Sequence, residues 1–211
     1  MSLTTAGNIK IWERYPDNQI PVFKEVMPDS QRILDISSGM DKTCVVYKDG
    51  TVWCWGENID GLYSLSSPTP LQITELYDII ALETGNYSTT ETVLRSDGTV
   101  WNWGENWSGQ LGTGTTVSSS VPVQVKNLDN VISVSSAYHN SMAIKDDGSV
   151  WAWGYNSSGQ LGDGTTTDRY IPIQVLHLDN IVAISAGWDH CLALNNDGKV
   201  WAWGELAWYV G

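Results

Sequence analysis

The stretch DGSVWAWGYN at residues 147–156 occurs in four similar copies along the chain. The others are DGTVWCWGEN at 49–58, DGTVWNWGEN at 97–106 and DGKVWAWGE at 197–205, and successive copies begin 48, 50 and 50 residues apart. Self-similarity at a fixed period of this length is typical of proteins built from stacked structural repeats. We therefore expect residues 1–211 to form a single repeat domain.

Each copy lies between segments with the alternating pattern of β-strands. An apolar run precedes every Asp-Gly pair: TCVVYK at 43–48, ETVLRS at 91–96, SMAIKD at 141–146 and CLALNN at 191–196. Asp-Gly between two such runs predicts a hairpin with a type I′ turn, in which both central residues have positive φ. Another β-rich run precedes each hairpin, and a short strand around proline follows the first three. This pattern predicts an all-β propeller with four-stranded antiparallel blades at about 32–73, 79–125, 131–175 and 181–205.

The tryptophans follow the same period, and the chain has 12 of them against a single Phe. Each copy carries two tryptophans two positions apart, which places both on one face of the third strand. Such pairs are interpreted as packing between blades, in preference to platforms for sugars or nucleobases. The expected structural residues are these pairs and the glycine after each: Trp53, Trp55, Gly56, Trp101, Trp103, Gly104, Trp151, Trp153, Gly154, Trp201, Trp203 and Gly204.

The chain has three cysteines, two of which flank the first Asp-Gly turn. With Asp49 and Gly50 at the centre of that turn, Cys44 and Cys54 would point to opposite faces of the sheet. No disulfide is therefore expected, and both are interpreted as small core residues, not as metal or redox ligands.

The string VISVSSAYHNSMAIKDDGSVWAWGYNSSGQLGDGTTTDRYIPIQV at 131–175 resembles a bacterial repeat of the RCC1 (regulator of chromosome condensation) family nearly throughout. The units at 79–125 and 181–204 match well, and 33–73 matches less closely. The resemblance implies a β-propeller, typically of seven blades. Members of the family act as exchange factors for a small GTPase, as protein-binding modules or as secreted inhibitors of β-lactamases. The family's histidine before the second strand survives only as His190, which is interpreted as a structural hydrogen-bonding residue.

Four innermost strands are too few for the ring that the resemblance implies. The segment GNIKIWERYP at 7–16 resembles a third strand and PVFKEV at 21–26 an outer strand, so these N-terminal strands, within 7–26, could complete the last blade. Three arrangements stay open: two chains forming an eight-blade ring, a fragment of a longer propeller, and a closed four-blade monomer. Self-association to a dimer is the favoured one, because it would also cover sheet faces and edges.

Charge and motifs exclude several classes of function. The formal net charge is −13, with 11 Lys and Arg against 24 Asp and Glu, so nucleic-acid binding is not expected. No spanning segment or secretion signal is found, no membrane association is expected, and the compartment stays undetermined. No nucleophile elbow, metal-spaced His or Cys set or phosphate loop occurs, which predicts a protein that is not an enzyme and has no cofactor or metal. A Ca²⁺ cluster of Asp163, Asp168 and Asp189 is weighed against simpler turn roles.

The loops after the first and third strands are expected at the same end of the propeller. They are rich in aromatic residues that do not follow the repeat, and such residues are favoured at protein interfaces. The main hypothesis is a non-enzymatic scaffold that binds a protein partner at this end. The alternatives are a glycan-binding or hydrolytic propeller and a secreted enzyme-inhibitor-like propeller. The candidate binding residues are Met40, Tyr87, Trp107, Tyr138, His139, Tyr155 and Trp188.

Overall fold

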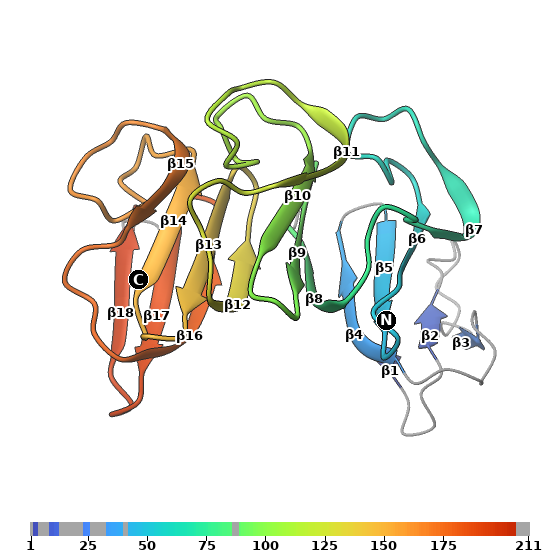
Figure 1. The fold of residues 1–211 in the computed structure, drawn as a ribbon, viewed down its shortest axis with the longest axis horizontal. Helices are drawn as coiled ribbons and strands as arrows, with labels where there is room; N and C mark the ends of the chain where they lie inside the picture. Colours follow the sequence, from blue (N-terminus) through green and yellow to red (C-terminus); the bar gives the residue numbers. More distant parts are fainter. Residues whose placement is uncertain are drawn as a thin grey trace, which may run out of the picture.

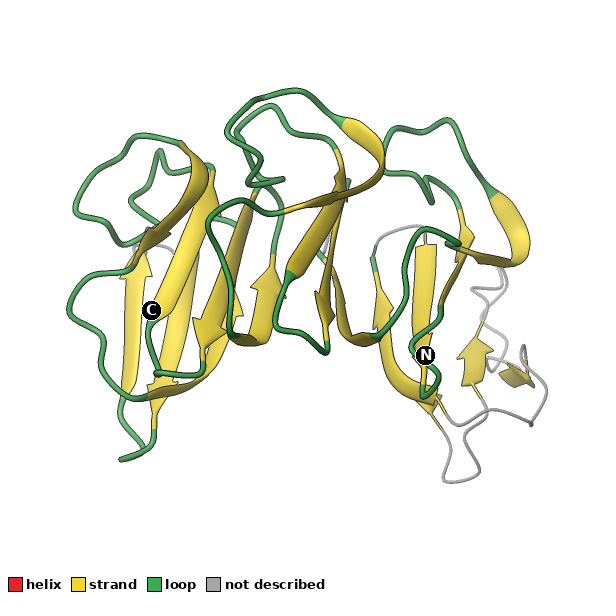
Figure 2. Ribbon diagram, in the orientation of Figure 1, coloured by secondary structure: helices red, strands yellow, loops and turns green. Residues whose placement is uncertain are grey.

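The structure, a computed structural model, describes residues 2–3, 9–12, 23–25, 33–39, 42–85 and 89–205. Strands and connecting loops make up these residues (Figures 1 and 2). None of them forms a helix long and apolar enough to cross a membrane. The expected all-β propeller class is confirmed.

Four blades follow one another along the chain. The first is β4 (Ile33–Ser38), β5 (Lys42–Tyr47), β6 (Val52–Gly56) and β7 (Ser67–Gln72). The second is β8 (Ile79–Thr84), β9 (Thr90–Arg95), β10 (Val100–Gly104) and β11 (Ser119–Gln124). The third is β12 (Val131–Ser136), β13 (Asn140–Lys145), β14 (Val150–Gly154) and β15 (Arg169–Gln174). The fourth contains β16 (Ile181–Ala186), β17 (His190–Asn195) and β18 (Val200–Gly204).

Strands pair in chain order within each blade, and every pairing is antiparallel. The first three blades have four strands, whereas the sheet of the fourth has the order β16-β17-β18. A separate three-stranded sheet is formed by β1 (Ser2–Leu3), β2 (Ile9–Trp12) and β3 (Phe23–Glu25). The N-terminal strands therefore do not complete the last blade of their own chain.

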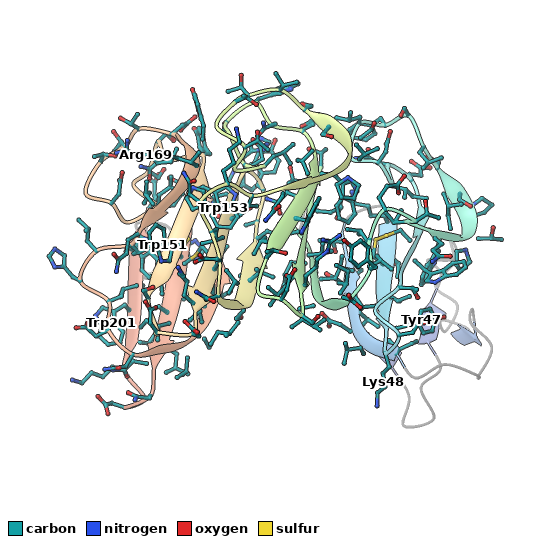
Figure 3. All side chains as sticks on the ribbon, in the orientation of Figure 1. Tyr47, Lys48, Trp151, Trp153, Arg169 and Trp201 are labelled. Atoms are coloured by element: carbon teal, nitrogen blue, oxygen red, sulfur yellow. A yellow bond between two sulfur atoms is a disulfide. The ribbon has the colours of Figure 1, made fainter. Side chains whose placement is uncertain are left out.

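The core lies between successive blades. One cluster joins Cys44, Val46 and Val52 of the first blade to Val93 and Trp103 of the second, and equivalent clusters join the second to the third and the third to the fourth. One face of each of the first three blades is thus covered by the tryptophan-bearing face of the next. Figure 3 shows the labelled tryptophans of the third and fourth blades on their strands.

The two tryptophans of a pair do different things. In the first three blades the first tryptophan is half-buried and donates to a hydroxyl of its own hairpin loop, as Trp151 Nε1 does to Ser149 Oγ at 3.0 Å. In the second to fourth blades the second tryptophan donates to the backbone of the preceding blade, as Trp103 Nε1 does to the Ile59 carbonyl oxygen at 3.2 Å. Aromatic packing and a buried hydrogen bond therefore act at the same interface.

The hairpin turns differ from the expected type I′ geometry. Gly50 N donates to Tyr47 O and Tyr47 N to Thr51 O, each at 2.9 Å, so the loop has three residues, 48–50. Gly50 has φ +79°, whereas Asp49 is not among the residues with positive φ. This is a turn closed by a left-handed glycine, and it shifts the strand register by one residue from that expected.

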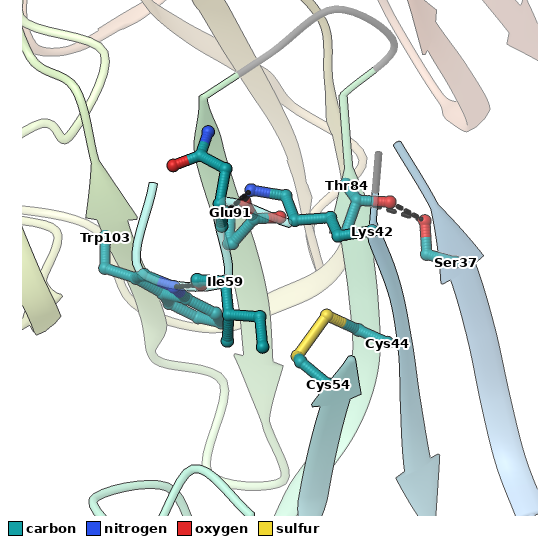
Figure 4. The surroundings of a disulfide bond; sticks show 9 residues. Ser37, Lys42, Cys44, Cys54, Ile59, Thr84, Glu91 and Trp103 are labelled. Carbon is teal, nitrogen blue, oxygen red and sulfur yellow. Dashed lines mark hydrogen bonds and ion pairs between the residues drawn. A yellow bond between two sulfur atoms is a disulfide. The ribbon is translucent and has the colours of Figure 1, made fainter. Parts of the chain in front are cut away.

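That shift makes the expectation for the cysteines wrong. Cys44 pairs directly with Cys54 across β5 and β6, and the two form a disulfide with a Cα–Cα distance of 4.1 Å (Figure 4). Moving the register by one residue turns both side chains to the same face of the sheet. Cys191 is a buried free thiol, and burial raises its pKa to about 12.

A buried ion pair joins the first two blades next to this disulfide (Figure 4). Lys42 Nζ contacts a carboxylate oxygen of Glu91, and both side chains are almost fully buried. Lys42 also donates to the carbonyl oxygen of Asn58 at 3.0 Å. Asn58 belongs to the first blade and Glu91 to the second, so Lys42 binds to residues of both blades and helps to fix how they pack together.

The innermost strands are joined by side-chain hydrogen bonds. Ser37 Oγ accepts from Thr84 N at 3.0 Å, and Ser135 Oγ accepts from Ala186 N at 3.1 Å. The carboxylate of Asp35 accepts from Leu82 N at 2.9 Å. Figure 1 shows the blades laid out as a continuous arc, with the first and fourth blades at opposite ends. The single chain therefore does not close into a four-blade ring, and the closed four-blade monomer is excluded.

An aromatic surface at one end of the blades

The site is built on loops that the sequence motif itself holds in place. In the long loop of the third blade, Asn156 Oδ1 accepts from Leu161 N at 2.9 Å, and its Nδ2 donates to the carbonyl oxygens of Thr165 and Thr167. Asn106 makes the equivalent bonds in the second blade. Each asparagine is fully buried, so one side chain replaces the backbone pairing that a loop lacks.

Four of the expected binding residues form a continuous row of rings. The Tyr138 ring centroid lies 4.4 Å from that of Trp188 and 3.8 Å from that of His139. His139 in turn meets Tyr155 edge-on at 6.4 Å. The row therefore joins loops after first strands to a loop after a third strand and spans the third and fourth blades.

Among the expected residues that the structure describes, Trp107 is the most exposed, with 73% of its surface accessible, and Trp188 is 53% exposed. Tyr138, His139 and Tyr155 are half-buried. We call the surface formed by Trp107, Tyr138, His139, Tyr155 and Trp188 the aromatic surface. Met40 and Tyr87 lie outside the described residues.

Hydrogen bonds to neighbouring loops fix the row. Asn140 Nδ2 donates to the carbonyl oxygens of Gly187 and Trp188 at 3.1 and 3.2 Å. Gln110 Nε2 lies 3.1 Å from His139 Nδ1, which makes the two a hydrogen-bonded pair between the second and third blades. Sequence reasoning missed Gln110 and its counterpart Gln160, although both stand in the intact GQLG loop motif.

The surroundings of the aromatic surface are acidic. Burial lowers the pKa of His139 below that of a free imidazole, while the nearby carboxylates of Glu105 and Asp168 act in the opposite direction. The neutral imidazole is therefore favoured near pH 7, and the charges that act on it are the carboxylates of Glu105 and Asp168.

A pocket of about 520 Å³ adjoins the aromatic surface along the innermost strands. Its wall is mostly hydroxyl-bearing, with Ser37, Ser135 and Ser185 at equivalent places and Tyr138 and Trp188 among the lining residues. Glu83 takes the place of the serine in the second blade, and sequence reasoning missed it. Burial, and secondly the charge of Asp35, raise the pKa of Glu83 to about 7.

Two of the three aspartates that were weighed as a calcium cluster have the simpler roles in loop structure. Asp163 pairs with Arg169 and accepts from Thr165 Oγ1 at 2.7 Å, and Asp168 accepts from Asn156 N at 2.9 Å. Among the described residues, no group of three or more His, Cys, Asp and Glu is placed to hold a metal ion. These aspartates organise the long loop of the third blade.

Comparison with known proteins agrees with this fold. A family model described as the regulator of chromosome condensation (RCC1) repeat matches residues 97–144 and 147–194, and a second with the same description matches 33–61 and 131–160. No curated protein sequence matches the chain.

Solved structures with a similar fold include human WBSCR16, at 22% identity and a TM-score of 0.73 over 83% of this chain and 48% of that one. Prp20p from Saccharomyces cerevisiae matches at 18% identity and a TM-score of 0.78, over 95% of this chain and 54% of that one. The computationally designed Ika4 protein matches at 14% identity and a TM-score of 0.50, over 85% of this chain and 94% of that one. The chain thus spans about half the length of the first two.

Proposed function

We propose that this chain, which belongs to the regulator of chromosome condensation (RCC1) repeat family, is a non-enzymatic protein-binding module that holds its partner on the aromatic surface. The observation that carries the proposal is the row of rings from Trp188 through Tyr138 and His139 to Tyr155, to which the long loop of the second blade adds the exposed Trp107 at the same end of the blades. Tryptophan and tyrosine contribute most of the binding energy at many protein interfaces, since they bury a large area with few rotatable bonds.

The surface is suited to binding because it is already ordered. Asn140 holds the Trp188 loop, and Asn106 and Asn156 hold the two long loops. A partner would therefore lose little free energy to ordering these loops, which leaves more of the contact energy for affinity.

Charge indicates the kind of partner. The chain carries 24 Asp and Glu against 11 Lys and Arg, and Glu105 and Asp168 act on His139 at the centre of the surface. A partner with a basic rim around an apolar or aromatic centre would complement it, and the association rate should fall as salt is raised.

Prp20p, which has a similar fold, binds Gsp1p and histones. At 18% identity that likeness concerns the fold, so the partner of this chain has to be found by experiment.

A photo-crosslinking residue at position 107 tests the proposal directly. The same residue at position 77 is the matched control, because Tyr77 is 59% exposed and lies in the connection between β7 and β8, outside the aromatic surface. We expect one protein to crosslink from position 107 only, and Trp188→Ala or Tyr138→Ala to abolish it. Equal crosslinking from both positions, or a crosslink that survives both substitutions, would rule the proposal out.

A second candidate is glycan binding, which the hydroxyl-lined pocket next to Tyr138 and Trp188 favours. Sugars bind through aromatic faces and through hydroxyl and carboxyl groups, and Glu83 would supply the carboxyl. Titration with a panel of oligosaccharides should then change the tryptophan fluorescence of the wild type but not of Trp188→Ala. The absence of any saturable change would eliminate this candidate.

A further inference from the structure

The outer strand of the third blade lies in a slot that the second blade helps to form. β15 pairs with β14, and Gly114 N of the preceding long loop donates to the Tyr170 carbonyl oxygen at 2.7 Å. Tyr170 also packs so closely on Gly109 that a Cβ there would collide with its ring. The slot thus has two walls, the edge of the third strand and the glycine loop of the blade before.

The equivalent slot in the fourth blade is unfilled by the described residues. β18 forms the outer edge of its sheet, and a groove of about 440 Å³ lies beside it. Its walls are the counterparts of those around β15, with Gly159 and Gly164 from the long loop and Trp201 and Ala202 from the third strand. A Cβ added to Gly159, the counterpart of Gly109, would have only the Thr165 carbonyl oxygen within 4 Å among the described residues.

The sheet face next to this groove is also uncovered. In the third blade, Met142, Ile144 and Val150 are at most 1% exposed, because the fourth blade covers them. Their counterparts in the fourth blade, Leu192, Leu194 and Val200, are 37%, 36% and 65% exposed. Apolar residues at equivalent positions are thus buried in the third blade and exposed in the fourth. The exposed face and the groove beside it therefore form one contact surface that no described residue covers.

The backbone of β18 is oriented to accept a strand there. In the third blade, Val175 N donates to the Val150 carbonyl oxygen at 2.9 Å, so alternate residues from Val150 onward face the outer strand. By the same register, Val200 and Ala202 of β18 direct their backbone groups into the groove. An unpaired sheet edge of this kind binds extended segments by strand addition.

The occupant can be deduced from the outer strands already in place. The outer strands of the second and third blades carry proline between two β-branched residues, at 121–123 (VPV) and 171–173 (IPI). The N-terminal segment has the same pattern at 20–22 (IPV). This segment runs into β3, which forms an edge of its own sheet and can therefore pair further. β3 lies at the end of the arc opposite β18, so it cannot reach β18 of the same chain (Figure 1).

We propose that the groove and open face of the fourth blade bind a second copy of this chain, whose segment 20–25 adds to β18 as the missing outer strand. The body of the second copy then covers Leu192, Leu194 and Val200 as the next blade does elsewhere. Two copies would also supply the length of the natural solved structures, of which one copy covers 48% to 54%.

The oligomeric state of two matched variants tests this proposal by light scattering. Val200→Arg places a charge on the open face, and its side chain is exposed, so the fold of the single chain should persist. Val182→Arg is the control, because Val182 and its counterpart Ile132 are 56% and 57% exposed, outside the blade contact in both blades. We expect the wild type and Val182→Arg to have twice the mass of 23.3 kDa. Val200→Arg should be a monomer that still unfolds cooperatively, at a lower melting temperature because it lacks the stabilisation that the partner copy supplies.

A synthetic peptide of residues 18–27 tests the strand itself. It should convert the wild-type dimer to monomer and bind Val182→Arg, whereas a scrambled peptide should do neither. A monomeric wild type, a dimer that Val200→Arg leaves intact, or a dimer indifferent to the peptide would each overturn the proposal. A wild type that is monomeric before the peptide is added, and that then binds the peptide, would also overturn it, because a second copy would not be the occupant.

Discussion

The indole Nε1 of Trp153 donates to the backbone carbonyl oxygen of Gln110, 2.8 Å away in the preceding blade. Trp203 makes the same bond to Gln160 at 2.8 Å. Since the side-chain amide of Gln110 also meets His139 at 3.1 Å, one residue joins the core between the blades to the aromatic surface. The position of the proposed binding residues therefore depends on how the blades pack.

The two tryptophans of one pair should differ in their contribution to stability. Trp153→Phe removes the buried bond to Gln110 and leaves a cavity, so the free energy of unfolding should fall by about 2–4 kcal/mol. Trp151 is half-buried and donates to Ser149 within its own hairpin instead of across the blade contact, so Trp151→Phe should cost about 1 kcal/mol. Urea denaturation of both variants measures the difference, and equal losses would contradict the role assigned to Trp153.

Removing one partner of the buried Lys42–Glu91 pair should cost more than removing both. Lys42→Met leaves a buried carboxyl group without its cation, and we expect a loss of about 3 kcal/mol in the free energy of unfolding. The double variant Lys42→Met with Glu91→Leu should recover most of that loss. A double-mutant cycle by chemical denaturation gives the coupling, and additive losses would argue against a coupled pair.

Glu83 should make stability depend on pH. Its pKa is raised from 4.5 to about 7 in the folded protein, so the folded state binds this proton more tightly than the unfolded state does. The stability that this proton confers is complete below pH 4.5 and is lost as the pH rises through about 7. Glu83→Gln should therefore be more stable relative to the wild type at pH 8 than at pH 4. Glu75→Gln, at an exposed position, is the control in the same thermal melts and should show no such trend.

The Cys44–Cys54 disulfide should be detectable and should stabilise the first blade. Peptide mapping without reduction should find these two cysteines linked and Cys191 as the free thiol. Replacing both by alanine should lower the free energy of unfolding by about 2–3 kcal/mol, because the unfolded chain loses the closure of a short loop. Cys191→Ala keeps the disulfide and serves as the control. Its loss of stability relative to the wild type should be the same under oxidising and reducing conditions.

The glycine after each tryptophan pair should resist substitution. Gly154 has φ +102°, and a Cβ there would collide with the carbonyl oxygen of His139. Gly198→Ala is the matched control, since Gly198 has φ +81° but nothing within 4 Å of the added atom. We expect Gly154→Ala to cost at least about 2 kcal/mol and Gly198→Ala about 1 kcal/mol, as measured by thermal or urea unfolding. Similar losses would show that backbone strain, not the collision, dominates.

Much of the fold could be predicted from local pattern. The period of 48 to 50 residues, the alternation of apolar residues and the Trp-x-Trp pairs indicated four blades, and the strands begin within two or three residues of the expected places. The turn type was wrong, because Asp-Gly fits both a two-residue turn and a three-residue turn that ends in glycine. The resulting shift of one residue in register places Cys44 and Cys54 on the same face of the sheet, where opposite faces had been expected.

The aromatic loops could be identified from the sequence because Tyr138, His139, Tyr155 and Trp188 depart from the repeat. Their ring contacts, and the link from Gln110 to His139, could not, because they join residues of different loops and, for Trp188 and Gln110, of different blades. Neither could the raised pKa of Glu83, which depends on burial among strands far apart in the chain.

The sequence by itself determined the repeat, the strands and which face of each blade is apolar, since these follow from spacing of one or two residues along a strand. Only the tertiary structure decided that the blades form an open arc and that Leu192, Leu194 and Val200 of the last blade are left exposed. The physical reason is that the burial of a residue depends on the blade packed against it. The alternation of residues along a strand specifies which face is apolar, but it does not specify whether a neighbouring blade is present.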